Sequence, residues 1–398
     1  MSISDKELIV NTKIFLILIA ILLIFFSGCQ RVQQVVTPDA PSIDITSIKI
    51  GVIQPSGYYT GFGQGAELAR TEINARGGVL GKQIEFIVRD NQGTRFVPDA
   101  AESVRIAKTL IEQDGVSAIL GPIFSNNSIE VGPVVQQLQR PIIPGSAGDH
   151  VTAAGDFVFL VAPTTSAHGA VMAQFAIEPS ELSATTAATI RQTESAYTES
   201  LTEAFEENFR ELGGKIVATE VYQVGDNIFD EQLTNIKAAA PDVLYIAGII
   251  PDIHFVMAQA RKIGIQATFL GPGSWDEVQK LFSTLTDNSP LEGAYFTADF
   301  SPEVPSAEHF VQAYTALFMT PPDSAAASGY DAMSLLATAI EDAQTLNPTA
   351  VRDALSNITN HKGATFISHY NANRHPIKSV VINTIRDGQI ELYKVVSP

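Results

Sequence analysis

The strongest constraint on the fold is an order of strands and helices that occurs twice along the chain. In the first copy, apolar stretches typical of strands, at Ile48–Ile53, Lys82–Asp90 and Val116–Leu120, are separated by stretches with apolar residues every three or four positions. The same order returns between Thr185 and Ala247. Such alternation requires parallel strands, right-handed crossovers and helices on both faces of each sheet. The sequence therefore predicts an α/β fold with two doubly wound parallel-sheet lobes.

Glycine pairs mark equivalent points in the two copies. Gly77-Gly78 follows the first predicted helix of one copy, and Gly213-Gly214 follows the first predicted helix of the other. Glycine ends helices because it adopts left-handed backbone angles without steric cost. The second helices are predicted at Asp99–Gln113 and Asp230–Ala239.

Residues 1–28 have the pattern of a secretory signal. Basic residues are followed by an apolar run from Ile14 to Phe26, and then by Ser27 and Gly28 directly before Cys29. As a helix this run rises roughly 20 Å, which is short of the ~30 Å hydrocarbon core of a membrane. A signal is therefore favoured over the alternative, a permanent membrane span.

Cys29 is the only cysteine in the chain, so no intramolecular disulfide is possible. The residues Phe26-Ser-Gly-Cys29 resemble the bacterial lipobox, which implies that Cys29 becomes the acylated first residue; an incidental cysteine is the alternative. Residues 29–46 would then be the lipidated cysteine and a tether, because the stretch after Cys29 is polar and contains proline. Stable anchoring requires more than one acyl chain.

The formal net charge of −18 restricts the partners. A strongly acidic body repels phosphate backbones and anionic lipid headgroups. We therefore expect no nucleic-acid binding, and we expect membrane contact only through the lipid anchor.

The sequence lacks the motifs of an enzyme. The seven histidines are dispersed, and none forms the paired helical spacing of a zinc site. There is no nucleophile elbow and no phosphate-binding loop. We expect no catalytic residue, no metal and no cofactor.

Several motifs, in matching order and spacing, resemble the type I periplasmic solute-binding proteins of ABC transporters, in the branched-chain amino-acid (Leu/Ile/Val) family. In the first copy they are Ile48-Lys-Ile-Gly-Val-Ile53, Gly65-Ala-Glu-Leu-Ala69, Ile73-Asn-Ala-Arg-Gly-Gly-Val-Leu-Gly81 and Arg89-Asp-Asn-Gln-Gly93. Farther on they are Pro241-Asp242, Ala260-Arg-Lys-Ile-Gly264 and Gly329-Tyr-Asp-Ala332. The resemblance extends from Ser47 nearly to the C-terminus.

This resemblance implies a hinge in which the chain crosses between the lobes three times. Lobe one would comprise residues 47–163 and 298–370, and lobe two residues 164–297 and 371–398. The implied protein is an exported monomer, lipid-anchored in the periplasm or on the outer face of the membrane, with ABC permease and ATPase subunits as partners.

In α/β sheets, ligands bind beyond the carboxyl ends of the strands. The loops predicted there are rich in hydroxyl groups and glycine, which suits a carboxylate. In the family the positions matching Ser125, Ser146 and Gly148 line the ligand carboxylate, and we place Asn126 and Ala147 beside them. The alternative is that Ser125 or Asn126 only caps the following helix.

Aromatic residues at the same strand ends are candidates for the wall of the ligand site. We expect Tyr58, Tyr59, Tyr197 and Trp275 among the ligand contacts. Packing at the edges of the lobes is the alternative for such residues.

Two positions depart from the family pattern. The acidic side chain that binds the ligand ammonium should fall at Gly273, and its aromatic partner at Ile249, so neither can accept a hydrogen bond from an ammonium. Burying an unpaired ammonium costs several kcal/mol. We therefore expect a carboxylate or amide-type solute rather than leucine, unless a nearby acid, namely Asp252, Asp276 or Glu194, takes over this role.

The sequence leaves two classes of function open. In the first, the protein captures a small polar organic solute between the lobes and delivers it to an ABC importer. This solute would be amino-acid-like, a carboxylate or an amide. The alternative is a lipoprotein of the same fold that acts as a ligand sensor or protein-interaction regulator in the cell envelope.

Overall fold

The computed structural model describes residues 47–56, 60–91, 99–249, 252–278 and 287–398. The chain from Thr46 onward groups as one compact unit. The expected signal, Cys29, the tether, Tyr58 and Tyr59 all lie outside the described residues. None of the helices in the described ranges combines the length and hydropathy that crossing a membrane requires.

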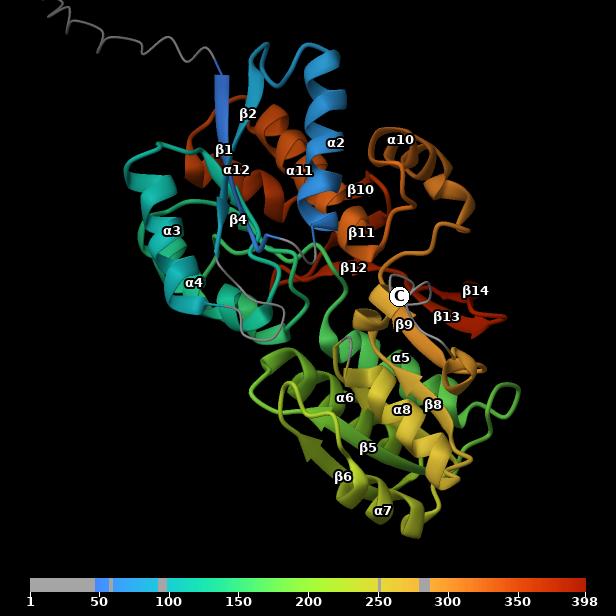
Figure 1. Ribbon diagram of the computed structural model, residues 1–398. Coiled ribbons are helices and arrows are strands. Elements are labelled where there is room, and N and C mark those ends of the chain that lie inside the picture. The colour runs from blue at the N-terminus through green and yellow to red at the C-terminus, as the bar shows by residue number, and fades with distance from the viewer. Residues whose placement is uncertain (1–46, 57–59, 92–98, 250–251, 279–286) are drawn as a thin grey trace, which may run out of the picture. The chain divides into compact units, whose positions relative to one another are not determined.

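The first sheet has four parallel strands in the order β2-β1-β3-β4 (Figure 1). The strands are β1 (Ser47–Gln54), β2 (Gln83–Asp90), β3 (Ala118–Leu120) and β4 (Ile142–Ile143). The helices are α2 (Gly61–Ala75), α3 (Ala100–Glu112), α4 (Ser125–Gln137), α11 (Ser324–Ala343) and α12 (Pro348–Ser356). Helices α2, α11 and α12 pack on one face of the sheet, and α3 and α4 pack on the other. We call this sheet and its helices lobe one.

The second sheet has seven strands in the order β14-β13-β9-β8-β7-β5-β6. The strands are β5 (Thr186–Gln192), β6 (Lys215–Tyr222), β7 (Val243–Ala247), β8 (Thr268–Gly271), β9 (Tyr295–Ala298), β13 (Val380–Arg386) and β14 (Gln389–Val396). The helices are α5 (Thr165–Ile177), α6 (Ala196–Glu211), α7 (Asp230–Ala239) and α8 (Asp252–Ile263). Helices α7 and α8 pack on one face, and α5 and α6 pack on the other. We call this sheet and its helices lobe two.

Strands β5 to β9 are parallel, whereas β13 runs antiparallel to both β9 and β14. A third, antiparallel sheet contains β10 (Thr359–Lys362), β11 (Phe366–Tyr370) and β12 (Pro376–Lys378). The remaining elements are α10 (Glu308–Phe318) and the short 3-10 segments η1 (Asp149–Ala154), η2 (Gly273–Val278), η3 (Ser289–Leu291) and η4 (Pro305–Ala307). The predicted α/β class with two doubly wound lobes is confirmed.

Helices α2 and α11 approach each other closely because each has a glycine at the contact. A Cβ atom on Gly65 would lie 1.8 Å from the Ala326 carbonyl oxygen, and one on Gly329 would lie 1.8 Å from the Phe62 carbonyl oxygen. Both obstacles are backbone, so no side chain can move to make room. This contact fixes the position of the first turns of α11.

Helix α11 begins at Ser324, five residues ahead of the Gly329-Tyr-Asp-Ala332 motif. Asp323 caps this end, since its side chain accepts a hydrogen bond from the Ala326 N–H at 2.8 Å. The helix residues ahead of this motif include Ser324 and Ser328, both buried. They belong to the site described next.

Candidate functional site

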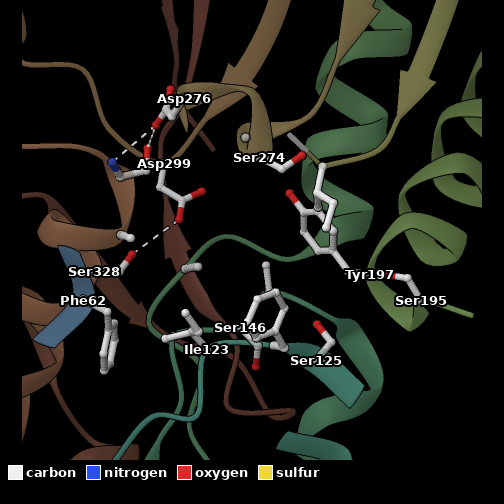
Figure 2. A pocket seen from close by; sticks show the side chains of 18 of the residues that line it. Phe62, Ile123, Ser125, Ser146, Ser195, Tyr197, Ser274, Asp276, Asp299 and Ser328 are labelled. Atoms are coloured by element: carbon white, nitrogen blue, oxygen red, sulfur yellow. Dashed lines mark hydrogen bonds between the residues drawn. The ribbon is translucent and has the colours of Figure 1, made fainter. Parts of the chain in front are cut away.

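A cavity of about 270 Å³ opens between the two lobes at the carboxyl ends of their parallel strands (Figure 2). Lobe one contributes loops after β3 and β4 and the start of α11, and lobe two contributes loops after β5, β7, β8 and β9. The volume lies just below the ~300–1,000 Å³ typical of small-molecule sites. A solute the size of an amino acid suits it better than a peptide or a nucleotide.

One end of the cavity carries hydroxyl groups. Ser125 is the first residue of α4, and its Oγ accepts a hydrogen bond from the Gly148 N–H at 3.3 Å. Ser146 donates through its Oγ to the Oγ of Ser128 at 3.0 Å. The helix cap position is Phe124, whose side chain makes no cap bond, so Ser125 does not cap α4. The hydroxyls and the N-terminus of α4 together favour a negatively charged oxygen at this end.

The other end is acidic, and Figure 2 shows its labelled carboxylates, Asp276 and Asp299, across the cavity from Ser125 and Ser146. The carboxylate of Asp276, in lobe two, accepts hydrogen bonds from the N–H and the hydroxyl of Ser324 at the start of α11. Burial raises the pKa of Asp276 well above its usual range, and the neighbouring charges of Asp323 and Asp299 raise it further. A cation at this end would stabilise the ionised form of Asp276.

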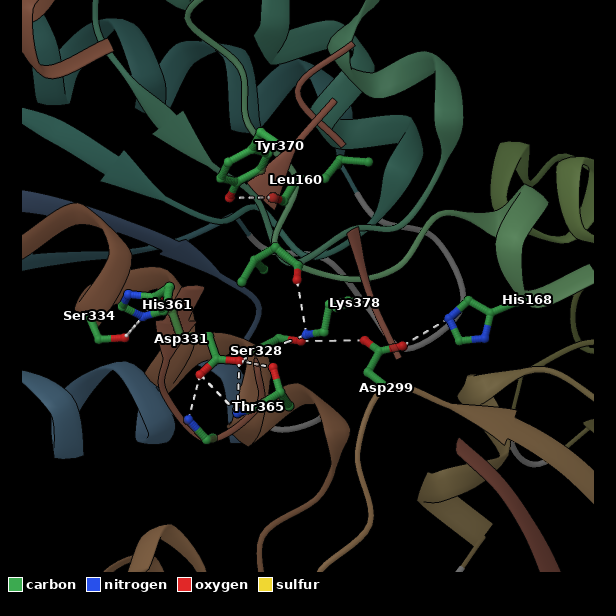
Figure 3. Close-up of polar contacts among 12 residues, drawn as sticks. Leu160, His168, Asp299, Ser328, Asp331, Ser334, His361, Thr365, Tyr370 and Lys378 are labelled. Atoms are coloured by element: carbon green, nitrogen blue, oxygen red, sulfur yellow. Dashed lines mark hydrogen bonds and ion pairs between the residues drawn. The ribbon is translucent and has the colours of Figure 1, made fainter. Parts of the chain in front are cut away.

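Asp299 joins both lobes at the edge of the cavity (Figure 3). Its Oδ1 lies 2.9 Å from His168 Nε2 on α5, and its Oδ2 accepts from the hydroxyl of Ser328 on α11 at 3.4 Å. Ser324 and Ser328 are one helical turn apart, so one face of α11 presents both hydroxyls to lobe-two carboxylates. Asp276 and Asp299 therefore contact α11 and line the cavity at the same time.

A buried ion pair lies near this network (Figure 3). The Lys378 ammonium is 3.8 Å from Asp331 and donates to the Val161 carbonyl oxygen at 3.2 Å. Asp331 also accepts from the N–H groups of Ala364 and Thr365. The pair thus ties α11 to the end of β12 and to the segment that precedes α5, which are near two of the predicted crossings between the lobes.

Tyr197, on the first turn of α6, forms a side wall with its hydroxyl directed toward Ser274 (Figure 2). Burial raises the pKa of Tyr197, and the charge of Asp299 adds to this shift, so its hydroxyl remains a hydrogen-bond donor at neutral pH. A Cβ atom on Gly273 would be 4.0 Å from this hydroxyl oxygen. The missing side chain at Gly273 therefore leaves room in front of Tyr197.

The structure brings most of the predicted contact residues together. The predicted residues that line the cavity are Ser125, Asn126, Ser146, Ala147, Tyr197, Ile249 and Gly273. Gly148 lies behind them and donates its N–H to Ser125. Trp275 instead packs in the core of lobe two at 1% exposure, because its indole folds back over Gly271.

Of the three acids weighed as replacements, Asp276 and Glu194 line the cavity, whereas Asp252 does not. Sequence reasoning missed Asp299, Asp323 and His168. Among the residues that line the cavity in the described part of the chain there are four acids and neither lysine nor arginine. This imbalance favours a solute that carries a positive group.

Comparison with known proteins decides the family. A family model described as periplasmic binding protein matches residues 47–389. The chain belongs to the periplasmic binding protein family. The resemblance seen in its sequence motifs is thereby confirmed, and this periplasmic binding protein binds a solute rather than catalysing a reaction.

The protein is similar to several solute-binding proteins. It is 28% identical over 233 residues to an amino acid binding protein of Pseudomonas aeruginosa, a match that spans 57% of this chain and 60% of that protein. A leucine-binding protein, LivK, of Thermotoga maritima superposes with a TM-score of 0.80 at 28% identity, covering 88% of this chain and 99% of that one. The substrate-binding protein LivJ of Streptococcus pneumoniae, in complex with isoleucine, gives 0.79 at 28% identity, covering 88% and 100%.

Proposed function

We propose that this periplasmic binding protein captures an amino-acid-like zwitterion outside the cytoplasm and delivers it to an ABC importer. The observation that carries the proposal is the contrast between the two ends of the cavity. Hydroxyl groups and a helix N-terminus lie at one end, and the carboxylates of Asp276 and Asp299 lie at the other.

The acidic lining argues against a simple carboxylate. A monoanion could bind at Ser125 and Ser146, but it would add negative charge beside Asp276 and Asp299 without any cation to compensate it. A zwitterion avoids this penalty because its ammonium faces the acids.

The departures at Gly273 and Ile249 then receive a different interpretation. Gly273 stands where the family has its acid, and it has no side chain. However, Asp276 lies three residues later in the same 3-10 segment, and Asp299 directly follows the next strand, β9. Either carboxylate could neutralise an ammonium. An α-amino acid is therefore compatible with Gly273 and Ile249, and relatives that bind leucine and isoleucine support such a ligand.

The aliphatic part of the solute would contact the apolar residues between the two ends. The side chains available are Phe62, Ile123, Phe124, Ala147, Val224 and Ile249. This mixture of aliphatic and aromatic groups suits a short hydrophobic side chain.

We also propose that Cys29 carries a lipid anchor and that the lobes divide at the residues given above. Wild-type protein expressed in a bacterium with radiolabelled palmitate should take up label and sediment with membranes, and the Cys29→Ser variant should do neither. Label that persists in the variant would exclude Cys29 as the anchor.

A thermal-shift screen tests the solute class. The panel holds aliphatic and aromatic amino acids, their deaminated acids and their decarboxylated amines, each in excess. A solute at 100 times its dissociation constant stabilises the protein by about 2.7 kcal/mol, which is a shift of several degrees. We expect shifts only with zwitterions. A larger shift with the deaminated acids would overturn the zwitterion proposal, and no shift with any compound would favour the interaction-protein alternative.

A further inference from the structure

Asn126 lines the cavity, yet both polar atoms of its side-chain amide hydrogen-bond to the other lobe. Its Nδ2 donates to the carbonyl oxygen of Glu194 at 3.0 Å, and its Oδ1 accepts from the N–H of Ala196 at 2.9 Å. Asn126 belongs to the first turn of α4 in lobe one, and Ala196 is the first residue of α6 in lobe two. We call this pair of hydrogen bonds the Asn126 clasp.

The clasp supplies a partner that α6 cannot provide for itself. The first N–H groups of a helix have no acceptor within the helix. Ser195 caps α6 by accepting from the Thr198 N–H at 3.3 Å, which leaves the Ala196 N–H to an acceptor from elsewhere. Asn126 provides it from the opposite lobe.

Both halves of the clasp are held in place within their own lobes. Beside Asn126, Ser128 donates to the Phe124 carbonyl oxygen at 3.0 Å, and Asn127 donates to Ser103 at 2.8 Å. Glu194 has a φ of 60°, an uncommon left-handed conformation for a residue other than glycine. Thr193 donates its N–H to the Tyr222 carbonyl oxygen at 2.8 Å, which ties this turn to β6. Two rigid segments therefore meet through one side chain.

We propose that Asn126 is a positioning residue that stabilises the joined arrangement of the two lobes, and that it does not itself bind the solute. A net amide hydrogen bond is a factor of about 2 to 12, and the exposed position of Asn126 places its two bonds at the low end, about threefold each. Losing both therefore lowers the ratio of joined to separated lobes about tenfold. The effect acts on closure alone, so it weakens every solute by the same factor.

This proposal rests on the proposed function only for its solute-binding readout. The contact between Asp276 and Ser324 also joins the lobes, but Asp276 belongs to the acidic end of the cavity, so changing it would alter solute recognition as well. Asn126 is the cleaner residue to test because both polar groups of its side chain are accounted for.

Pulsed dipolar spectroscopy measures the ratio directly. Spin labels are attached in a Cys29→Ser background through Lys108→Cys on α3 and Glu207→Cys on α6, both exposed positions. Distances are recorded without solute and during titration with L-isoleucine. The variants are Asn126→Ala and, as a matched control, Glu130→Ala at an exposed position one turn later on α4.

We expect the control to match the parent protein. The short distance between the labels represents the joined lobes and the long distance the separated lobes. At each L-isoleucine concentration, Asn126→Ala should lower the ratio of the short-distance to the long-distance population about tenfold. Its dissociation constants for L-isoleucine and L-leucine should rise by the same factor. Identical distance distributions for the two variants would overturn the proposal, as would a changed preference between the two amino acids. If no amino acid binds, a shift in the solute-free distances still supports the clasp, whereas the zwitterion proposal fails.

Discussion

Replacing Lys378 with methionine should destabilise the protein strongly, because the buried Asp331 carboxylate loses its cation and must either stay charged without it or take up a proton. The two side chains are 1% and 0% exposed, and the ammonium lies 3.8 Å from the carboxylate. At an effective dielectric constant of about 20, this separation corresponds to about 4 kcal/mol. Breaking a buried pair from one side typically costs about 3–5 kcal/mol, which agrees. We expect Lys378→Met to lower the free energy of unfolding by about 4 kcal/mol at pH 7.

The loss should depend on pH. Burial already raises the pKa of Asp331, and the charge of Lys378 opposes this shift. Without Lys378 the pKa rises further, so the native state keeps a proton that the unfolded state has released. Stability of the variant should therefore fall as pH increases from the ordinary carboxyl range toward the raised pKa, more steeply than in the wild type.

Urea unfolding followed by circular dichroism at pH 5, 7 and 8 measures both effects. Lys362→Met, at an exposed position in the same three-stranded sheet, is the matched control and should change stability by less than about 0.5 kcal/mol. The combined Asp331→Asn and Lys378→Met variant should be more stable than Lys378→Met alone, because no buried charge remains. A Lys378→Met protein within about 1 kcal/mol of the wild type at pH 7 and 8 would refute the reasoning.

Three further predictions concern the site and the packing around it. Ser125→Ala should weaken binding of a carboxylate-bearing solute by about 1–3 kcal/mol in calorimetry, and unchanged affinity would remove this hydroxyl from the site. Gly329→Ala should lower the free energy of unfolding by about 2 kcal/mol or more in urea, because its Cβ would meet the Phe62 backbone; wild-type stability would contradict the close contact. Affinity for a zwitterion should rise with pH up to the raised pKa of Asp276, because the bound ammonium favours its ionised form and the complex holds fewer protons than the free protein. Affinity that falls over this range would exclude Asp276 as an ammonium partner.

The fold could be predicted largely from local patterns. Helix α7 has the predicted bounds, and strand β2 begins one residue after its predicted start, because alternating apolar residues and helical periodicity are properties of short segments. The start of α11 was missed because its cap, Asp323, resembles any other acid in a polar stretch. The close contact at Gly65 and Gly329 depends on two segments far apart in the sequence, and periodicity contains no information about it.

The part of the site that follows directly after strands was also predictable from local sequence. Ser125 and Ser146 follow strands, and the general rule for α/β sheets places such residues at the ligand. Asp299 also follows a strand, but its place at the cavity depends on its contact with Ser328 on α11. The local sequence around Asp299 does not predict this contact. Trp275 shows the opposite case, because an aromatic residue at a strand end turns toward the core when a glycine such as Gly271 leaves space for it.

Calorimetry with matched ligands shows whether the two ends of the cavity recognise opposite charges, since each ligand keeps or lacks one of the two charged groups. L-leucine carries both groups, 4-methylpentanoate lacks the ammonium, and 3-methylbutylamine lacks the carboxylate. A cavity with hydroxyls at one end and Asp276 and Asp299 at the other should bind L-leucine at least tenfold more tightly than either analogue, corresponding to about 1.4 kcal/mol or more. Equal or tighter binding of 4-methylpentanoate would contradict the account, because the acidic end would then play no part in recognition.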